Sequence, residues 1–257
     1  MINLRIDDKS VTASEGETVL DVANANGIFI PALCNHKAVT PYGSCRLCLV
    51  EVEKLGRKRV VASCSYLAAE AIRVNTRAPK ALEARNIAME LLLARCPDNQ
   101  AVRAMAGKMG VYSSRFKKRE HDCILCGLCV RVCREVIGAD CISFSGRGSE
   151  RQVVTPYNKP SQQCMGCGAC AVVCPTGAIR LKRDGAAVIL PEWQTVLRQA
   201  KCRQCGQYFA SCRQLDHVQS KLNDESQLAY MCPDCRRKHF SRQALYACAY
   251  RKLHRPV

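Results

Sequence analysis

Residues 123–133 read CILCGLCVRVC, and residues 164–175 read CMGCGACAVVCP. Both stretches contain the spacing C-x2-C-x2-C-x3-C, so the chain carries one cysteine pattern twice. The first three cysteines of such a copy turn around one corner of a cubane, while the fourth points to a second centre. The repeat therefore predicts two [4Fe-4S] clusters with crossed ligands. Zinc, the alternative metal, more often uses paired CxxC turns.

A repeat of this kind is typical of a bacterial-type two-cluster ferredoxin, which we expect over residues 121–190. CPTGAI after the second copy matches that pattern, whereas CREVIG after the first lacks its proline. Cys141 falls outside the repeat, and we expect it to pack as a buried thiol. We expect one centre to be held by Cys123, Cys126, Cys129 and Cys174, and the other by Cys164, Cys167, Cys170 and Cys133.

Residues 1–78 carry four more cysteines within a pattern of short strands. INLRID, CLVEVE, KRVVASC and AIRVNT read as strands, and SVTASEGETVLDVANANG reads as a strand followed by a helix that ends at Gly27. A mixed sheet crossed by one helix, of the β-grasp type, fits this order. The cysteines are spaced C-x10-C-x2-C-x15-C, which suits a [2Fe-2S] cluster better than four buried thiols. The expected ligands are Cys34, Cys45, Cys48 and Cys64.

IPALCNH, GSCRLCLVEVE and VASC around these cysteines resemble the amino-terminal [2Fe-2S] region of three kinds of protein. They are the large iron-sulfur subunit of complex I, the small iron-sulfur subunit of soluble NAD-linked hydrogenases, and iron-only hydrogenases. The resemblance covers roughly residues 1–185. It implies an electron-transfer subunit whose partners are a flavin subunit that reacts with NAD(P)H and a catalytic subunit such as a hydrogenase or formate dehydrogenase. Electron-bifurcating complexes belong to the same group.

Residues 79–120 depart from that family, which places a further [4Fe-4S] cluster here on His-x3-Cys-x2-Cys-x5-Cys. One thiolate cannot hold a cubane, so we predict that this cluster is absent and that the segment is a helical connector. PKALEARNIAMELLLAR within it predicts a helix with a broad apolar face that includes Leu82 and Leu91. The family's four ligand positions are occupied by Leu92, Cys96, Asn99 and Met105.

Residues 196–257 contain KCRQCGQYFASC and, further on, MCPDC. Two CxxC turns that face each other make a tetrahedral site of four sulfurs, the geometry of structural zinc, so we predict a zinc-ribbon-like module. A third [4Fe-4S] cluster is the alternative. SRQALYACAYRKLH reads as a helix. The expected zinc ligands are Cys202, Cys205, Cys232 and Cys235, with His217 and His239 as weaker candidates, and Cys212 and Cys248 are expected to pack.

Composition supports an α+β chain of small metal-containing modules. The 257 residues include 20 cysteines and 5% aromatics, and the formal charge is +17. Four thiolate-bound sites of about −2 each would reduce that charge to about +9. Residues 196–257 carry 12 basic and four acidic side chains. No leader or membrane-length apolar run is found, so we expect a soluble, cytoplasmic protein with thiols kept for metal.

No GxGxxG motif and no phosphate-binding loop occur, so we assign no nucleotide site and no catalytic residue. We therefore expect an electron-transfer subunit and not a complete enzyme. Two other functions stay open. The chain could be a free-standing polyferredoxin that carries electrons between enzymes. It could also be an iron-sulfur redox sensor that binds nucleic acid through its basic tail, although we consider nucleic acid the weaker partner because anionic clusters account for much of the basicity.

Overall fold

The computed structural model describes residues 1–222 and 228–241. Two compact units make up the chain. The first consists of residues 1–154 and 169–179, and the second consists of residues 155–168 and the chain from residue 180 onward.

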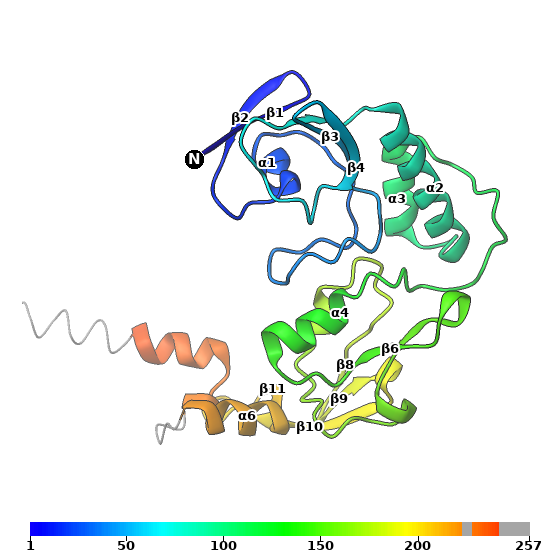
Figure 1. The fold of residues 1–257 in the computed structure, drawn as a ribbon. Helices are drawn as coiled ribbons and strands as arrows, with labels where there is room; N and C mark the ends of the chain where they lie inside the picture. The colour runs from blue at the N-terminus through cyan, green and yellow to red at the C-terminus, as the bar shows by residue number, and fades with distance from the viewer. Residues whose placement is uncertain (223–227, 242–257) are drawn as a thin grey trace, which may run out of the picture. The chain divides into compact units, whose positions relative to one another are not determined.

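A five-stranded sheet opens the first unit (Figure 1). Its strand order is β2-β1-β5-β3-β4, with β1 and β5 parallel and the other neighbours antiparallel. This is the mixed β-grasp arrangement expected from the strand pattern. The strands are β1 (Ile2–Ile6), β2 (Lys9–Ala13), β3 (Leu49–Lys54), β4 (Arg57–Ala62) and β5 (Arg73–Asn75).

The helix α1 (Val19–Ala25) packs its apolar side chains into the core of this sheet. Thr18 accepts a hydrogen bond from the backbone N–H of Asp21, and Asp21 in turn accepts one from the backbone N–H of Thr18. Such a capping box fixes the start of a helix. The predicted strand–helix–strand order of residues 1–78 is confirmed, and it leaves residues 34–48 as a long loop before β3.

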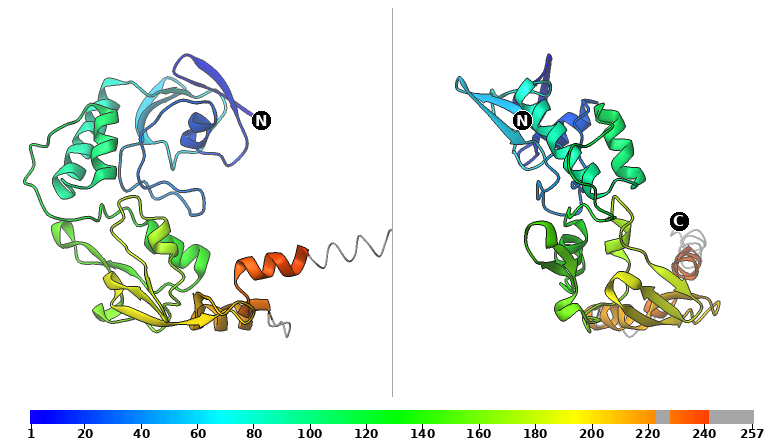
Figure 2. Two further views of the ribbon diagram at one scale, coloured as in Figure 1. Left: turned by 180° about the vertical axis from the view of Figure 1, so that it is seen from behind. Right: turned by 90° about the vertical axis from the view of Figure 1, so that its right-hand side faces the viewer.

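Two helices, α2 (Pro79–Arg95) and α3 (Gln100–Met109), follow the sheet and lie side by side (Figures 1 and 2). The predicted apolar face of α2 is partly wrong. Leu82 and Leu91 are 40% and 49% exposed, whereas Arg85 is only 5% exposed. Met89, Leu92 and Leu93 do enter the core. Arg85 replaces an apolar residue there because its guanidinium finds a backbone carbonyl, that of Leu49.

The remainder of the first unit is built from short elements. They are α4 (Leu128–Arg131), the π-helix η1 (Val132–Ile137), β6 (Ser143–Ser145), η2 (Gly148–Glu150), β7 (Gln152–Val154) and α5 (Ala169–Val172). α4 and η1 follow one another directly and form one continuous helical segment. β6 pairs with β7 as a hairpin. A π-helical turn is rare and is often found at functional sites.

The second unit is organised by an antiparallel sheet of order β11-β10-β9-β8. Its helices are α6 (Cys212–Leu222) and a helix that begins at residue 233 and is described to residue 241. The first of these was not predicted, although Leu215, Val218 and Leu222 recur at helical spacing. The helix expected over residues 241–254 and Cys248 fall outside the described residues, apart from Ser241. The other elements are η3 (Pro156–Asn158), β8 (Lys182–Asp184), β9 (Ala187–Leu190), η4 (Pro191–Trp193), β10 (Thr195–Lys201), β11 (Tyr208–Ser211) and η5 (Leu228–Tyr230).

In the two described stretches of chain, no helix has the length and apolar character needed to cross a bilayer.

Candidate iron-sulfur and metal sites

The four cysteines of the sheet domain are brought together by the loop of residues 34–48, which we call the cluster loop, and by the turn after β4. All four are buried. The backbone N–H of Cys45 lies 3.4 Å from the Cys34 Sγ and donates to it. A thiol hydrogen bond from Cys45 lowers the pKa of Cys34, and one from Cys64 lowers the pKa of Cys48 to about 6. Thiols that share protons in this way are readily converted to metal-bound thiolates.

Arg85 tests whether an anionic cluster fits among these thiols. Its side chain is buried, its Nε donates to the Leu49 carbonyl, and its Nη2 has no hydrogen-bond partner in the part of the chain that the structure describes. Burial lowers the pKa of Arg85, while the negative charges of Cys48 and Asp7 oppose that shift. A buried cation with an unused donor is costly unless it faces negative charge. A [2Fe-2S] centre on four thiolates supplies such charge, so the residues present fit the group.

The first predicted cubane set lies wholly within the first unit. Burial, together with the negative charges of Cys123 and Cys174, raises the pKa of Cys126 to about 11. Burial likewise raises the pKa of Cys129, with contributions from the same neighbours. The backbone N–H of Leu125 donates to the Cys123 Sγ over 3.4 Å. Closely spaced thiols with raised pKa values, here Cys123, Cys126 and Cys129, fit a site in which iron supplies positive charge.

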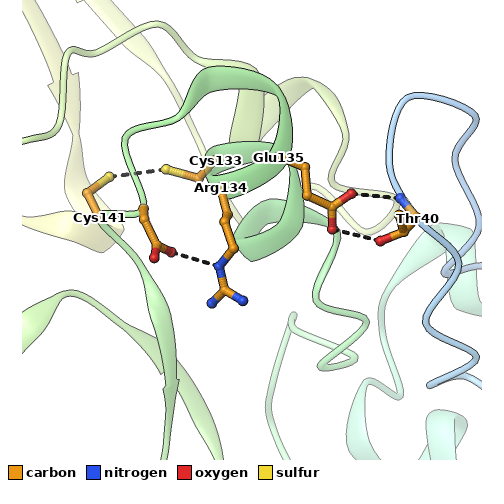
Figure 3. A network of polar contacts seen from close by, with 6 residues as sticks. Thr40, Cys133, Arg134, Glu135 and Cys141 are labelled. Atoms are coloured by element: carbon orange, nitrogen blue, oxygen red, sulfur yellow. Dashed lines mark hydrogen bonds and ion pairs between the residues drawn. The ribbon is translucent and has the colours of Figure 1, made fainter.

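The second predicted set is divided between the units. Cys133 and Cys170 belong to the first, and Cys164 and Cys167 belong to the second. Cys133 lies in η1, and its Sγ is 3.3 Å from the Sγ of Cys141 (Figure 3). Cys141 is buried, as expected of a thiol outside the repeat. The crossed ligation of the two centres stays a prediction.

The four tail cysteines converge on one point in the second unit. Their sulfur atoms all lie within 4.8 Å of one another, and three of the four side chains are buried. Cys202 and Cys205 occupy the turn between β10 and β11, where Gly206, with φ +73°, donates its N–H to the Cys202 carbonyl. Cys232 and Cys235 sit at the start of the helix that begins at residue 233. The group contains four cysteines and neither of the two candidate histidines.

Local hydrogen bonds lower the pKa of one of the four tail thiols, that of Cys202. Burial acts to raise the pKa of Cys202, but the backbone N–H groups of Cys232 and Cys205 outweigh it and lower that pKa to about 6. The N–H of Cys232 reaches the Cys202 Sγ over 3.2 Å. Cys212 is not part of the group. It lies beside Arg198, whose guanidinium donates to it, and it raises the pKa of that guanidinium.

The residues at the positions where the family holds its histidine-ligated cluster make packing and capping contacts in this chain. Leu92 and Cys96 are buried in an apolar core, and burial raises the pKa of Cys96 to about 12. The Asn99 side chain caps α3 by accepting from the backbone N–H groups of Ala101 and Val102. Met105 packs against the same core as Leu92. These side chains supply packing and a helix cap, and the absence of the cluster stays a prediction.

Comparison with protein-family models identifies three regions. Residues 1–79 match the 2Fe-2S iron-sulfur cluster binding domain. Residues 122–178 match a 4Fe-4S dicluster domain. A second 4Fe-4S dicluster model matches residues 163–218, a range that reaches from the second cysteine repeat into the tail.

Similar proteins include components of NAD(P)-linked oxidoreductases and hydrogenases. One component of an NADH-quinone oxidoreductase of Rhizobium meliloti (strain 1021) is 32% identical over 206 residues, which cover 70% of this chain and 24% of the relative. The NADPH-Fe(3+) oxidoreductase subunit alpha of Geobacter sulfurreducens (strain DL-1 / KN400) is 32% identical over 70% of this chain and 24% of its own length. The NADP-reducing hydrogenase subunit HndD of Solidesulfovibrio fructosivorans is 32% identical, over 70% of this chain and 36% of its own.

Among solved structures, a chain of an NAD+-reducing [NiFe]-hydrogenase in the H2-reduced state matches with a TM-score of 0.53 and 30% identity. The match covers 60% of this chain and 74% of that one. The chain spans about a quarter of the length of the first two curated relatives. The sequence motifs, the gathered thiols and these matches together show an iron-sulfur electron-transfer protein with a 2Fe-2S domain and 4Fe-4S dicluster domains, homologous to subunits of NAD(P)-linked oxidoreductases and hydrogenases.

Proposed function

We propose that this chain relays electrons between a flavin subunit that reacts with NAD(P)H and a catalytic subunit of the hydrogenase or formate dehydrogenase type. The observation that carries the proposal is the contact, within the first unit, between the chain segments that carry two of the predicted ligand sets. Ser44, next to Cys45, donates its hydroxyl to the carbonyl of Cys126 over 3.1 Å. Cys34, Cys45 and Cys126 also share one apolar core. Adjacent centres in one rigid core suit one-electron transfer, which is the chemistry that iron-sulfur clusters supply.

The proposed relay has three centres, each with its own thiolate set. The backbone N–H groups near the sulfurs and the burial of the thiols would set the reduction potential of each centre. The [2Fe-2S] ligands are Cys34, Cys45, Cys48 and Cys64, the first [4Fe-4S] ligands are Cys123, Cys126, Cys129 and Cys174, and the second are Cys164, Cys167, Cys170 and Cys133.

We assign zinc to the four tail cysteines. Sulfurs bound to one zinc ion at about 2.3 Å in a tetrahedron are about 3.8 Å apart. The Sγ atoms of Cys205 and Cys232 are 3.8 Å apart. In a cubane each thiolate binds a different iron, so the sulfurs stand farther apart. The dicluster match to residues 163–218 favours the alternative, but its range ends before Cys232 and includes Cys212, which is outside the group.

The partners and compartment follow from the same chemistry. A relay without a substrate site needs a donor and an acceptor, and the relatives' names contain NADH, NADPH and hydrogenase. Thiolate ligands stay reduced in the cytoplasm, where we place the protein. Electron bifurcation would belong to the whole complex, because it needs a flavin partner.

Anaerobic purification from the native host tests the proposal, followed by identification of the chains that co-purify. We expect a flavin-containing subunit and a larger catalytic subunit in fixed ratio with this chain. A chain that purifies alone and accepts electrons from several unrelated donors would instead be a polyferredoxin. Binding to DNA or RNA that weakens steeply with salt would indicate a redox sensor.

A further inference from the structure

The cluster loop contacts α4 and η1, the helical stretch that carries predicted ligands of both cubanes. Arg131 is the last residue of α4 and lies between Cys129 and Cys133. Although it is charged, only 9% of its side chain is exposed. Its Nη2 donates to the carbonyl of Cys34 over 3.1 Å, and its Nη1 donates to the carbonyl of Thr40. One buried guanidinium thus binds the cluster loop at two backbone positions.

Glu135, one turn further along the same helix, binds the remaining polar groups of Thr40. Its Oε2 accepts from the Thr40 N–H at 2.7 Å, and its Oε1 accepts from the Thr40 hydroxyl at 2.8 Å (Figure 3). These two bonds, that from the backbone N–H first, lower the pKa of Glu135, so the carboxylate is charged at neutral pH. The N–H, hydroxyl and carbonyl of Thr40 are therefore all bound by Arg131 and Glu135, a pair that we call the Thr40 clamp.

The helical stretch that contains the clamp also carries a predicted cluster ligand, Cys133, on its opposite side. Figure 3 shows Glu135 directed toward Thr40 and Cys133 directed the opposite way, toward Cys141. The Arg131 guanidinium also lies over the Tyr42 ring, 5.6 Å from its centroid, and Tyr42 stacks on Phe144. Gly127 fits beneath these rings, since a Cβ there would come within 3.1 Å of Phe144. The contact between the cluster loop and the segment α4–η1 thus combines close packing with charged hydrogen bonds.

We infer that Arg131 and Glu135 are positioning residues for electron transfer, which fix the cluster loop and its [2Fe-2S] centre at one distance from the first [4Fe-4S] centre. The inference rests on the proposed function for the identity of the two centres. All four hydrogen bonds are charge-assisted, and such bonds are stronger than those between neutral groups. The two from Arg131 are buried or partly buried, whereas the two to Glu135 are exposed. Electron transfer between fixed centres needs such rigidity, whereas a loop held only by its own cysteines could move.

The test uses the full chain with its clusters, in the variants Glu135→Ala and Arg131→Gln. Arg134→Ala is the matched control, because Arg134 lies on the same helix but pairs with exposed Asp140. Hydrogen exchange of the Thr40 amide is the first readout, and it needs no cluster. We expect exchange to become at least about tenfold faster in Glu135→Ala and to stay unchanged in the control.

Pulsed EPR of the reduced protein is the second readout, since magnetic coupling between the [2Fe-2S] and [4Fe-4S] centres depends on their separation. We expect one defined coupling in the wild type and the control, and a broadened or weaker one in Glu135→Ala at unchanged iron content. Unchanged exchange and coupling in Glu135→Ala would overturn the inference. If Arg131→Gln loses iron because its buried side chain is needed for folding, Glu135→Ala still tests the inference, since Glu135 is exposed. A wild type without the two cluster signals would refute the proposed function, while exchange at Thr40 would still report on the clamp.

Discussion

Cys133 is the residue whose role distinguishes crossed ligation from two independent centres. If it binds the centre of the second cysteine repeat, Cys133→Ser should damage the same cluster as Cys167→Ser. We expect the EPR spectra of these two variants to match each other and to differ from that of Cys126→Ser. Up to about four of about ten iron atoms should be lost in each case.

Cys141→Ser is the control for that comparison, because Cys141 lies beside Cys133 but outside the repeat. It should keep the full iron content. A spectrum of Cys133→Ser that instead matched Cys126→Ser would show that each repeat binds its own cluster.

Arg85 should tune the [2Fe-2S] centre, because it places a buried positive charge beside the ligand Cys48. Reduction adds negative charge to the cluster, so a neighbouring cation favours the reduced form. Arg85→Met should therefore lower the reduction potential, on the order of 50 mV for a partly screened unit charge.

An EPR-monitored redox titration measures this shift, and Arg77→Met, which removes an exposed arginine from the same cleft, should leave the potential nearly unchanged. Equal potentials for the wild type and Arg85→Met would mean that the guanidinium does not act on the cluster.

For individual residues, the sequence predicted which cysteines could be ligands but did not predict the charged side chains that contact the loops around them. Cysteine spacing is visible in one dimension, so the sheet-domain thiols and the paired CxxC turns could be anticipated. Arg85, Arg131 and Glu135 could not, because each looks like an ordinary surface charge until the fold places a backbone carbonyl or amide beside it. Arg85 even falls on the buried side of a helix where leucines were expected.

Among the elements, the pair α2 and α3 is held by ordinary contacts at the positions where we predict that the family's further cluster is absent. Asn99 caps α3 and also donates its Nδ2 to the Thr176 carbonyl over 2.8 Å. Asn99→Ala removes both interactions. We expect the free energy of unfolding to fall by about 1–2 kcal/mol, measured by denaturant titration.

Asp98→Ala is the matched control, since Asp98 makes only an exposed ion pair with Arg103 and should change stability by less than about 0.5 kcal/mol. An equal loss in the two variants would argue that the cap contributes little.

The tail module should depend on its metal for its structure. The four cysteine sulfurs bring together a hairpin turn, residues 202–205, and the start of a helix, residues 232–235. Removal of the ion by a chelator should disorder the helix that begins at residue 233 and leave the sheet domain intact, as hydrogen exchange would show.

Metal analysis of the same sample separates the two candidate metals. One zinc per chain with about ten iron atoms supports the assignment, whereas no zinc with about fourteen iron atoms would show a third cubane.

Elements were predicted best where local patterns decide them. The strands of residues 1–78 alternate apolar and polar residues, and a capping box marks α1. The β8 to β11 sheet was not foreseen, although each strand pairs with its neighbour in the chain, because β8, β9 and β11 have only three or four residues each and every residue of β8 is exposed. The expected start of the tail module at residue 196 falls one residue into β10, a strand that pairs with the earlier β9.

Over the whole molecule, electrons should enter and leave through partner subunits. The purified chain alone should not oxidise NADH or NADPH, since no nucleotide-binding motif is present in its sequence. Added flavin subunit should restore reduction of the clusters by the nicotinamide, measured by the bleaching of their visible absorbance. Reduction of the clusters by NAD(P)H without any partner would contradict the prediction that a separate flavin subunit reacts with the nicotinamide.

The central claim is that one chain carries a [2Fe-2S] centre and two [4Fe-4S] centres as a connected relay. EPR of the anaerobically purified full chain, recorded during stepwise reduction and combined with iron counting, tests it most directly. We predict one [2Fe-2S] signal and two [4Fe-4S] signals that couple magnetically to each other, with about ten iron atoms per chain. A chain that binds iron in only one cluster type, or zinc at the cysteine repeats of residues 123–133 and 164–174, would contradict it.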